Sequence, residues 1–301
     1  PTPSSAASDV YKRQIKNGLM TVSDGKITAL ESSDTVSVNS FRAKKTISAN
    51  GNIVMPGLIN MHCHAGDSLF RGLVENLPLE EWLGRVWIAE KAILTPETTY
   101  LGSILGLAEN LLSGATTVMD MFWYPEETAN AAKKLGMRIS TGGIFFDLPG
   151  IGGRCHEDYI SEAHQFSQNH EADENVIPAI LPHGSYTVSP ENLTDAKRIA
   201  DEYGILFCTH AAETKAEQND IKTRYNNSVI RHLSEHKLLG ENVVLAHCVH
   251  LDEKEISLLA KSKTNVVLNP MSNLKLGSGI APVKEMKRAG INLTIGTDGA
   301  I

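Results

Sequence analysis

The sequence predicts an α/β protein whose main domain is a (β/α)8 barrel of the TIM type with its last helix missing, preceded by a partial small β-domain. After residue 52, eight apolar strand-like runs alternate with helical patterns, which is the number that such a barrel needs. The runs are nearly continuous in Val, Ile and Leu, as is typical of parallel strands buried on both faces. Histidine or aspartate follows five of these runs, at the end where barrel enzymes build their sites. A doubly wound open sheet shows the same alternation, so the placement of these polar residues is what favours the barrel.

The composition excludes several classes of protein. The chain has 301 residues, of which 42% are hydrophobic, enough to bury a sizeable core. Its 28 Lys and Arg residues against 35 Asp and Glu residues give a net charge of −7, which argues against a nucleic-acid or anionic-membrane surface. No apolar run approaches the roughly 20 residues of a membrane span. We therefore expect a small-molecule partner, no nucleic acid and no membrane, and the sequence leaves open whether the chain forms a homo-oligomer.

The cysteines indicate a reducing compartment. They are widely scattered and include no Cys-x-x-Cys pair: Cys63, Cys155, Cys208 and Cys248. A chain of this length does not need disulfide bonds to fold, so we expect reduced thiols and a cytoplasmic location.

The N-terminal part divides into two segments. Residues 1–14 contain no apolar stretch, and we expect a disordered or non-native tail there. Residues 15–52 hold short β-like pieces separated by Asp-Gly and Asn-Gly pairs, which close hairpins, and are expected to be the partial small β-domain. These pieces are 18–22, 26–30, 35–38 and 45–47.

Residues 53–301 are expected to form the truncated barrel. The predicted strands are 53–61, 116–121, 138–146, 176–182, 205–209, 242–246, 265–269 and 292–296. The predicted helices are 96–113, 125–135, 157–169, 190–203, 219–236, 252–262 and 282–289. Proline follows Thr95 and Ser189, which is typical of the first helical position. Because the chain stops at Ile301, we expect a fragment whose eighth strand leaves its apolar residues uncovered. These are Ile291, Leu293 and Ile295.

Polar side chains gather at one end of the predicted barrel. They are His62 and His64 after strand one, His183 after strand four, His210 after strand five, His247 after strand six and Asp298 after strand eight. Residues two apart on a strand point to the same side, so the first two imidazoles can approach one ion together. With a third imidazole and a carboxylate they suit Zn²⁺ or Fe²⁺, with a position left for water. A lone histidine at a strand end is more often a hydrogen-bonded structural residue, but five strands sharing one end favour a metal site.

Several runs carry a resemblance to the amidohydrolase superfamily. They read PGLINMHCH at 56–64, HAAET at 210–214, AHCVHL at 246–251 and GTDGA at 296–300. The run NPMSNLKLGSGIAPV at 269–283 resembles the aminohydrolase branch that contains the 5-methylthioadenosine/S-adenosylhomocysteine deaminases. Chlorohydrolases and guanine deaminases are relatives of that branch. The similarity covers roughly residues 15–301 and is more specific for the superfamily than for the substrate.

The resemblance implies roles for the residues at the strand ends. The implied metal ligands are His62, His64, His210 and Asp298. Asp298 would also take a proton from the bound water, and His247 would polarise or orient the attacking hydroxide. Glu213 would be the proton shuttle to the ring nitrogen, the role of a non-ligand glutamate in unrelated zinc deaminases. The alternative for Glu213 is an acidic residue that opens a helix.

The resemblance also implies one metal per chain. Binuclear members carry a bridging carboxylated lysine or a glutamate near the fourth or third strand end. Here strand four ends in residues 181–183, Leu-Pro-His, without lysine. One divalent ion is therefore expected, with zinc ahead of iron.

Further residues are expected to contact the substrate. Glu90 matches the acidic residue that binds ribose hydroxyls in these deaminases; the alternative is a solvated charge on a helix. His183 and Glu213 would be substrate contacts too. Arg154 lies after strand three, where the family places a contact to a substrate carboxylate, but a surface arginine is the alternative. Trp82 forms either a wall of the pocket or part of the core.

Two departures from the family pattern weigh against S-adenosylhomocysteine itself as the substrate. Strand three reads Thr-Gly-Gly at 141–143, where the family deaminases often have an arginine. Strand seven reads Leu-Asn-Pro at 268–270, where many members have His-Asn-Pro. Both leave the hydrolytic chemistry untouched.

These observations lead to one expected function and to alternatives. We expect a hydrolase of carbon–nitrogen bonds, a metal-dependent deaminase of a purine nucleoside or related nitrogen heterocycle. A chlorohydrolase or deaminase of triazine, guanine or cytosine-type rings would keep the metal set. An inactive fragment of such an enzyme is the third alternative. A mere binding module would not need metal-polarising groups.

Overall fold

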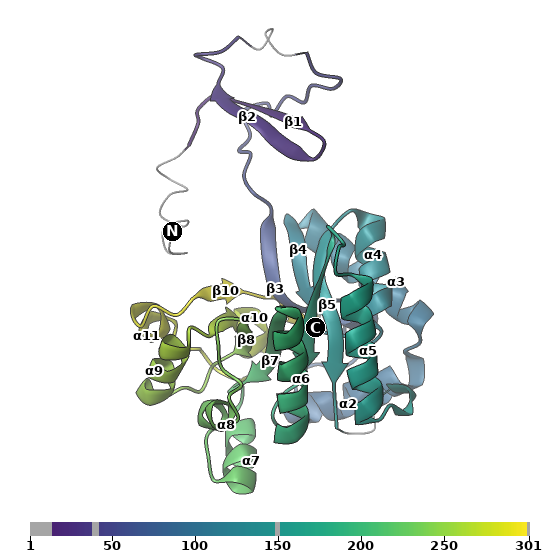
Figure 1. Ribbon diagram of the computed structural model, residues 1–301, viewed down its shortest axis with the longest axis vertical. Coiled ribbons are helices and arrows are strands. Elements are labelled where there is room, and N and C mark those ends of the chain that lie inside the picture. Colours follow the sequence, from purple (N-terminus) through teal and green to yellow (C-terminus); the bar gives the residue numbers. More distant parts are fainter. Residues whose placement is uncertain (1–13, 38–41, 148–150, 300–301) are drawn as a thin grey trace. The chain divides into compact units, whose positions relative to one another are not determined.

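The computed structural model describes residues 14–37, 42–147 and 151–299 (Figure 1). The chain divides into two units, Pro1–Pro56 and Gly57–Ile301. Nearly all of the expected N-terminal tail and the last residue of the expected strand 35–38 lie outside the described residues.

The smaller unit contains a β-hairpin. Strands β1 (Gly18–Ser23) and β2 (Lys26–Ser32) pair antiparallel. Asp24 and Gly25 between them have positive φ values of 50° and 74°, as a two-residue hairpin turn of type I′ requires.

Two expected strands of the smaller unit are wrong. The chain turns at residues 33–35, where the N–H groups of Thr35 and Val36 both donate to the carbonyl oxygen of Ser32, and residues 36 and 37 belong to no strand. Residues 45–47 have no regular secondary structure and pair with no strand among the described residues, and Ile47 is exposed. A β-like composition alone does not make a strand where no neighbour accepts its backbone hydrogen bonds.

The larger unit is built on one parallel sheet, which in the described residues has the order β10-β9-β8-β7-β6-β5-β4-β3-β11. Its strands are β3 (Leu58–His64), β4 (Ala115–Asp120), β5 (Arg138–Phe145), β6 (Val176–Pro182), β7 (Leu206–Ala211), β8 (Val243–His247), β9 (Asn265–Leu268), β10 (Leu293–Ile295) and β11 (Asp298–Gly299). β10 lies within the predicted eighth strand, 292–296, whereas β11 follows that strand and was not predicted. β10 pairs with β9 and β11 pairs with β3, so the sheet curls until its two ends are joined by one stretch of chain. The fold class predicted from the sequence is confirmed.

Helices α3, α4, α5 and α6 pack on the outside of this sheet, along β3 to β6 in Figure 1. The longer helices are α2 (Leu79–Ile93), α3 (Pro96–Leu112), α4 (Pro125–Leu135), α5 (His156–Asn169), α6 (Pro190–Tyr203), α7 (Lys215–Tyr225) and α9 (Glu253–Ser262). The shorter ones are η2 (Ala65–Phe70), η3 (Ile151–Gly153), α8 (Val229–Glu235), α10 (Pro270–Lys275) and α11 (Val283–Arg288). In the part of the chain that the structure describes, no helix combines the length and apolar character needed to cross a membrane.

The single helix expected over residues 219–236 is wrong. α7 ends at Asn226, which adopts a left-handed backbone conformation with φ 52°, and α8 starts after Ser228. Asparagine tolerates this conformation better than most residues, so it ends a helix much as glycine does. The apolar spacing continues across the break, because α7 and α8 both face the core.

Side chains from alternating strand positions fill the interior of the barrel. Among the buried members of this cluster are Met119, Met121, Ala179, Leu181, Cys208, Val244 and Val267. A second and larger apolar cluster includes side chains from α5, α6, α8 and α9 together with Phe145, Ile180 and Phe207 of the strands. The barrel interior is thus a packed core rather than a pore, and a ligand site is expected at the carboxyl ends of the strands.

The apolar residues around the eighth strand are less exposed than expected. Ile291 is buried and belongs to the large cluster with Met286 and Val266. Leu293 is half-buried, and only Ile295 of the three is exposed, with 64% of its surface accessible.

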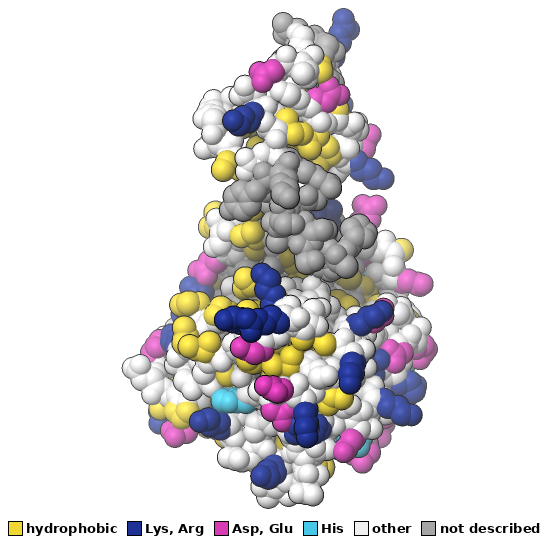
Figure 2. Space-filling view, turned by 90° about the vertical axis from the view of Figure 1, so that its left-hand side faces the viewer, with side chains coloured by type: hydrophobic (Ala, Val, Ile, Leu, Met, Phe, Trp, Pro, Cys, Tyr) yellow, Lys and Arg dark blue, Asp and Glu magenta, His cyan; other side chains and the backbone are white. Residues whose placement is uncertain are grey.

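On the face drawn in Figure 2, acidic and basic side chains are intermixed with hydrophobic ones.

Gly296 sits where the two ends of the sheet meet. Its N–H donates to the carbonyl oxygen of Leu268 at 2.9 Å, and the next N–H, of Thr297, donates to His62 at 3.1 Å. A Cβ atom at position 296 would lie 2.5 Å from Oδ1 of Asn269 and 2.8 Å from Cβ of His62. The closing stretch therefore fits against β3 only with glycine at this position.

Substituting Gly296→Ala should lower the free energy of unfolding by about 1–3 kcal/mol, because an added methyl group overpacks this contact. Denaturant unfolding of the purified protein measures it. Gly84→Ala is the matched control: Gly84 is exposed on α2 with no atom within 4 Å of an added Cβ, so alanine there should be neutral or slightly stabilising. Equal stability of the two variants would contradict the close packing at Gly296.

Candidate active site

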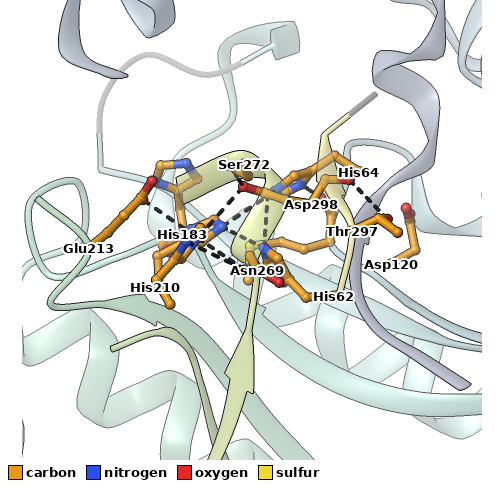
Figure 3. A network of polar contacts seen from close by, with 12 residues as sticks. His62, His64, Asp120, His183, His210, Glu213, Asn269, Ser272, Thr297 and Asp298 are labelled. Carbon is orange, nitrogen blue, oxygen red and sulfur yellow. Dashed lines mark hydrogen bonds and ion pairs between the residues drawn. The ribbon is translucent and has the colours of Figure 1, made fainter. Parts of the chain in front are cut away.

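Three imidazoles and one carboxylate converge at the carboxyl end of the barrel (Figure 3). Nε2 of His64 lies 3.0 Å from Oδ1 of Asp298, and Nε2 of His62 lies 3.3 Å from the same oxygen. Nε2 of His210 lies 3.0 Å from that of His62 and 3.3 Å from that of His64. β3, β7 and β11 carry these residues, so the shared direction of parallel strands brings them together as the sequence predicts.

The spacing of these four atoms fits a divalent metal ion. Ligands about 2.1 Å from a tetrahedral zinc ion lie roughly 3.4 Å apart, close to the separations found here. His62, His210, His247 and Asp298 also place one ligand atom each within 4.8 Å of one another. The set expected from the sequence has His64 in place of His247, and the two sets share three residues. The structure thus places five candidate ligands around one centre.

Hydrogen bonds on the far side of two rings aim their Nε2 atoms at this centre. Nδ1 of His64 lies 2.5 Å from the carbonyl oxygen of Met121, and Nδ1 of His210 lies 2.6 Å from that of His183. A carbonyl oxygen only accepts, so each Nδ1 carries the proton and each Nε2 of the neutral ring keeps its lone pair. Metal-binding histidines have this arrangement. Nδ1 of His62 has no hydrogen-bond partner among the described residues.

Asp298 is charged and firmly held. Burial acts to raise the pKa of its carboxyl group, but the hydrogen bonds from His62 and His64 outweigh it and hold this pKa well below its usual range. Burial lowers the pKa of His64, yet the hydrogen bond and charge of Asp298 raise it to about 10. Burial lowers the pKa of His62 to about 4. The site therefore concentrates negative charge at Asp298, which a proton on His64 or a divalent cation would neutralise.

Glu213 and His247 lie beside this cluster. Oε2 of Glu213 is 3.5 Å from Nε2 of His247, and its Oε1 accepts a hydrogen bond from Oγ of Ser278 at 3.2 Å. Nε2 of His247 is 3.8 Å from Oδ2 of Asp298. Burial raises the pKa of Glu213 to about 7, although the charge of His247 opposes it. A carboxyl group with such a pKa can both give and take a proton near neutral pH.

The backbone is strained at the ends of the strands that carry these groups. Ala212, His247, Cys248 and Asp298 all have left-handed conformations, with φ values of 54°, 75°, 48° and 67°. Such values cost energy in residues other than glycine and cluster at functional sites. Here the turns after β7 and β8 support each other, because N–H of Cys248 donates to Ala211 at 3.0 Å and N–H of Val249 donates to Ala212 at 2.9 Å.

One segment, residues 269–278, positions several of these groups. Oγ of Ser272 donates to Oδ2 of Asp298 at 2.5 Å, and Oδ1 of Asn273 lies 2.8 Å from Nδ1 of His247. The hydroxyl group of Ser278 binds Glu213, as described above. The sequence marked this run as a family signature but assigned no role to its members. The sequence feature that could have indicated these roles is the presence of serine and asparagine residues after the end of a strand.

A pocket of about 640 Å³, its open mouth included, lies over the cluster. Trp82, Glu90 and His183, three of the predicted substrate contacts, line it together with Glu213. Trp82 also packs in a small apolar cluster, so both of its predicted roles apply. Glu90 is buried, and its Oε2 accepts a hydrogen bond from Nε1 of Trp123 at 3.0 Å. The alternative of a solvated charge is therefore wrong for Glu90.

His183 enters the pocket as a neutral ring. Burial lowers its pKa to about 3. Nδ1 lies 2.8 Å from Oγ1 of Thr187, whose hydroxyl group donates to the carbonyl oxygen of Gly184. The threonine oxygen therefore accepts from Nδ1, and Nε2 of His183 is left as an acceptor.

Arg154 does not line the pocket. Its Nε donates to Oε1 of Glu162 at 2.7 Å and its Nη1 donates to the carbonyl oxygen of Ile151 at 2.7 Å. Its guanidinium group also lies over the ring of Tyr124, 5.0 Å from the centroid. The structure thus does not support the predicted contact to a substrate carboxylate, because local partners hold the side chain elsewhere.

Asp67, on η2, also lines the pocket and was missed by the sequence reasoning. It is 8% exposed, and its Oδ1 has no hydrogen-bond partner among the described residues. The sequence around it, AGDSLF, carries no pattern that predicts a site. Only its position three residues after His64 could have indicated that it lies near the site.

The fold and this site define a class of barrel proteins that can hold a metal ion at the carboxyl ends of their strands. The chain belongs to the Amidohydrolase family, whose model matches residues 53–301. It is 42% identical over 259 residues to the 5-methylthioadenosine/S-adenosylhomocysteine deaminase of Aquifex aeolicus, covering 86% of this chain and 60% of that relative. It is 39% identical over 293 residues to the 5'-deoxyadenosine deaminase of Methanosarcina acetivorans, covering 95% of this chain and 65% of that relative.

Solved structures share the fold. An adenosine deaminase from Xanthomonas campestris, crystallised with bound zinc, superposes with a TM-score of 0.91 at 31% identity. The match covers 95% of this chain and 65% of that one. The chain thus spans less than two thirds of the length of these relatives.

Proposed function

We propose that this chain carries the active site of a metal-dependent hydrolytic deaminase that cleaves a C–N bond of a purine nucleoside or related nitrogen heterocycle. The preferred substrates resemble 5-methylthioadenosine and S-adenosylhomocysteine. The observation that carries the proposal is the convergence of three imidazoles and a carboxylate beside a buried glutamate that lines the same pocket. The names of the relatives support it.

The metal site is proposed to hold one divalent ion, with zinc preferred over iron. Its ligands would be His62, His64, His210 and Asp298. A bound ion of this kind lowers the pKa of a coordinated water toward neutrality and so supplies a hydroxide.

The chain's own residues would move the protons. Glu213 is proposed to donate its carboxyl proton to the ring nitrogen while the attacking water loses a proton to Oδ2 of Asp298. His247 would orient that water through Nε2, because Asn273 binds its other ring nitrogen. The C–N bond would then break as Asp298 passes its proton to the amino group, which leaves as ammonia. The ring keeps the oxygen of the water, whose remaining proton returns to Glu213.

A second candidate is hydrolysis of triazine, guanine or cytosine-type rings, including removal of chloride. Such a reaction would need the metal set but would have no use for a ribose contact. Glu90 is buried and lines the pocket, which favours a nucleoside.

The small-molecule substrate and a cytoplasmic location complete the proposal. The four cysteines are free, and Cys63, Cys208 and Cys248 among them are buried. Burial raises the pKa of the Cys208 thiol to about 12, so this thiol stays protonated at neutral pH.

Ammonia release from a panel of compounds tests the proposal. The panel contains adenosine, 5'-deoxyadenosine, 5-methylthioadenosine, guanine, cytosine and a chlorotriazine. We expect release from the adenosine derivatives and little from the free bases. Chloride release from the triazine without deamination of any nucleoside would favour the second candidate, and no reaction with any compound would contradict both.

A further inference from the structure

The pocket contains acidic side chains but, among its described lining residues, neither lysine nor arginine. The acidic residues are Asp67, Glu90, Glu213 and Asp298. Asp298 and Glu213 face the metal centre, and the reaction proposed above uses both. Asp67 and Glu90 have no part in that reaction.

Asp67 and Glu90 interact with each other. Burial raises the pKa of Asp67 well above its usual range, and the charge of Glu90 adds to this, so the pair shares a proton until a cationic group of a ligand displaces it. Oε2 of Glu90 already accepts from Trp123, while Oδ1 of Asp67 accepts from no described residue. A buried oxygen without a donor is costly, and a ligand that supplies a donor removes this cost.

Asp67 is held in place by its surroundings. η2 starts where the N–H of Ala65 donates to Oδ1 of Asp120 at 2.6 Å. On its other side η2 packs against two glycines of α3, Gly102 and Gly106, at which an added Cβ would lie 2.5–2.6 Å from the nearest atoms of η2. The carboxyl group of Asp67 therefore has little freedom to turn away from the pocket.

We propose that Asp67 is a specificity-determining residue that, with Glu90, accepts hydrogen bonds from an uncharged or cationic part of the substrate and excludes substrates with a carboxylate. This inference rests on the proposed function and narrows its substrate class to nucleosides without an acidic group. A carboxylate in this pocket would meet two carboxyl groups and no lysine or arginine. Arg154, which was expected to bind a substrate carboxylate, is bound to Glu162 and does not line the pocket.

Binding of two deaminated nucleosides to the metal-loaded protein tests this without turnover. One is S-inosylhomocysteine, and the other is its decarboxylated counterpart, which keeps the ammonium group. Calorimetry should show that the wild type binds the decarboxylated compound at least about 10-fold more tightly, and that Asp67→Asn reduces this ratio about 10-fold, since charge-assisted hydrogen bonds are the strong ones. Glu171→Gln, which removes one negative charge from the surface, should leave the ratio unchanged.

If Asp67→Asn does not fold, Asp67→Ser serves as a second uncharged variant. Binding is measured only with a variant that unfolds cooperatively on heating. An unchanged ratio in a folded Asp67 variant would overturn the role of Asp67. If 5-methylthioadenosine is nevertheless deaminated by the wild type, the proposed function survives that result. If the wild type neither binds these nucleosides nor deaminates any, the proposed function fails and this inference fails with it.

Discussion

Replacing Glu213 by glutamine should lower turnover of the preferred nucleoside by a factor on the order of 10²–10⁴. Glutamine keeps the size of the side chain and can still accept the hydrogen bond from Ser278, but it cannot transfer a proton. The raised pKa of Glu213, about 7, is what makes the acid available at neutral pH, and an amide has no such group. Steady-state ammonia release measures the effect, and elemental analysis should find the metal content unchanged.

Glu255→Gln is the matched control for this variant. Glu255 is buried like Glu213, but it lies on α9, where its side chain accepts from the N–H of Asp252 in a capping box. Glutamine serves equally well at that position of the box. Turnover should therefore stay near the wild-type value. Full activity of the Glu213 variant would show that the proton route is misassigned.

Removing two imidazoles from β3 should have the second large effect. In the double variant His62→Ala plus His64→Ala, the metal content should fall from about one ion per chain to a small fraction of that. Two of the four converging atoms are lost, and the carboxylate of Asp298 loses both of its close imidazole neighbours. Elemental analysis after dialysis measures the remaining metal.

The control for this double variant removes two imidazoles elsewhere. His232 and His236 lie close together on and just after α8, with ring centroids 4.8 Å apart, and His232 stacks on Tyr225. Replacing both by alanine should leave the metal content intact even if stability falls. Full metal content in the His62 and His64 variant would contradict the metal site.

The strand-end residues were predictable because parallel strands in a barrel share one direction. Each run of buried apolar residues fixes where a strand ends, and the next polar side chain must lie at the common rim. The bounds of β6, α4 and α6 could be read directly from their flanking prolines and apolar spacing. The eighth strand was found, but the short strand β11 that follows Gly296 and Thr297 was not, because it depends on contacts with His62 and Leu268 that no local pattern shows.

The supporting residues were not predictable in the same way. Ser272, Asn273 and Ser278 reach three different site groups because the chain after β9 runs back across the rim, and a loop path has no periodic signature. For Arg154, in contrast, the sequence predicted a role that the structure does not support. Its long side chain can reach several partners, and nearby Glu162 binds it instead of a ligand.

The dependence of turnover on bound zinc tests the central proposal most directly. Metal-free protein is prepared with a chelator and titrated with zinc while ammonia release from 5-methylthioadenosine is measured. We expect no activity without metal, a rise in proportion to the zinc bound, and saturation at about one ion per chain. Undiminished ammonia release from the metal-free protein, or saturation only at two ions, would contradict a single-metal deaminase built on His62, His64, His210 and Asp298.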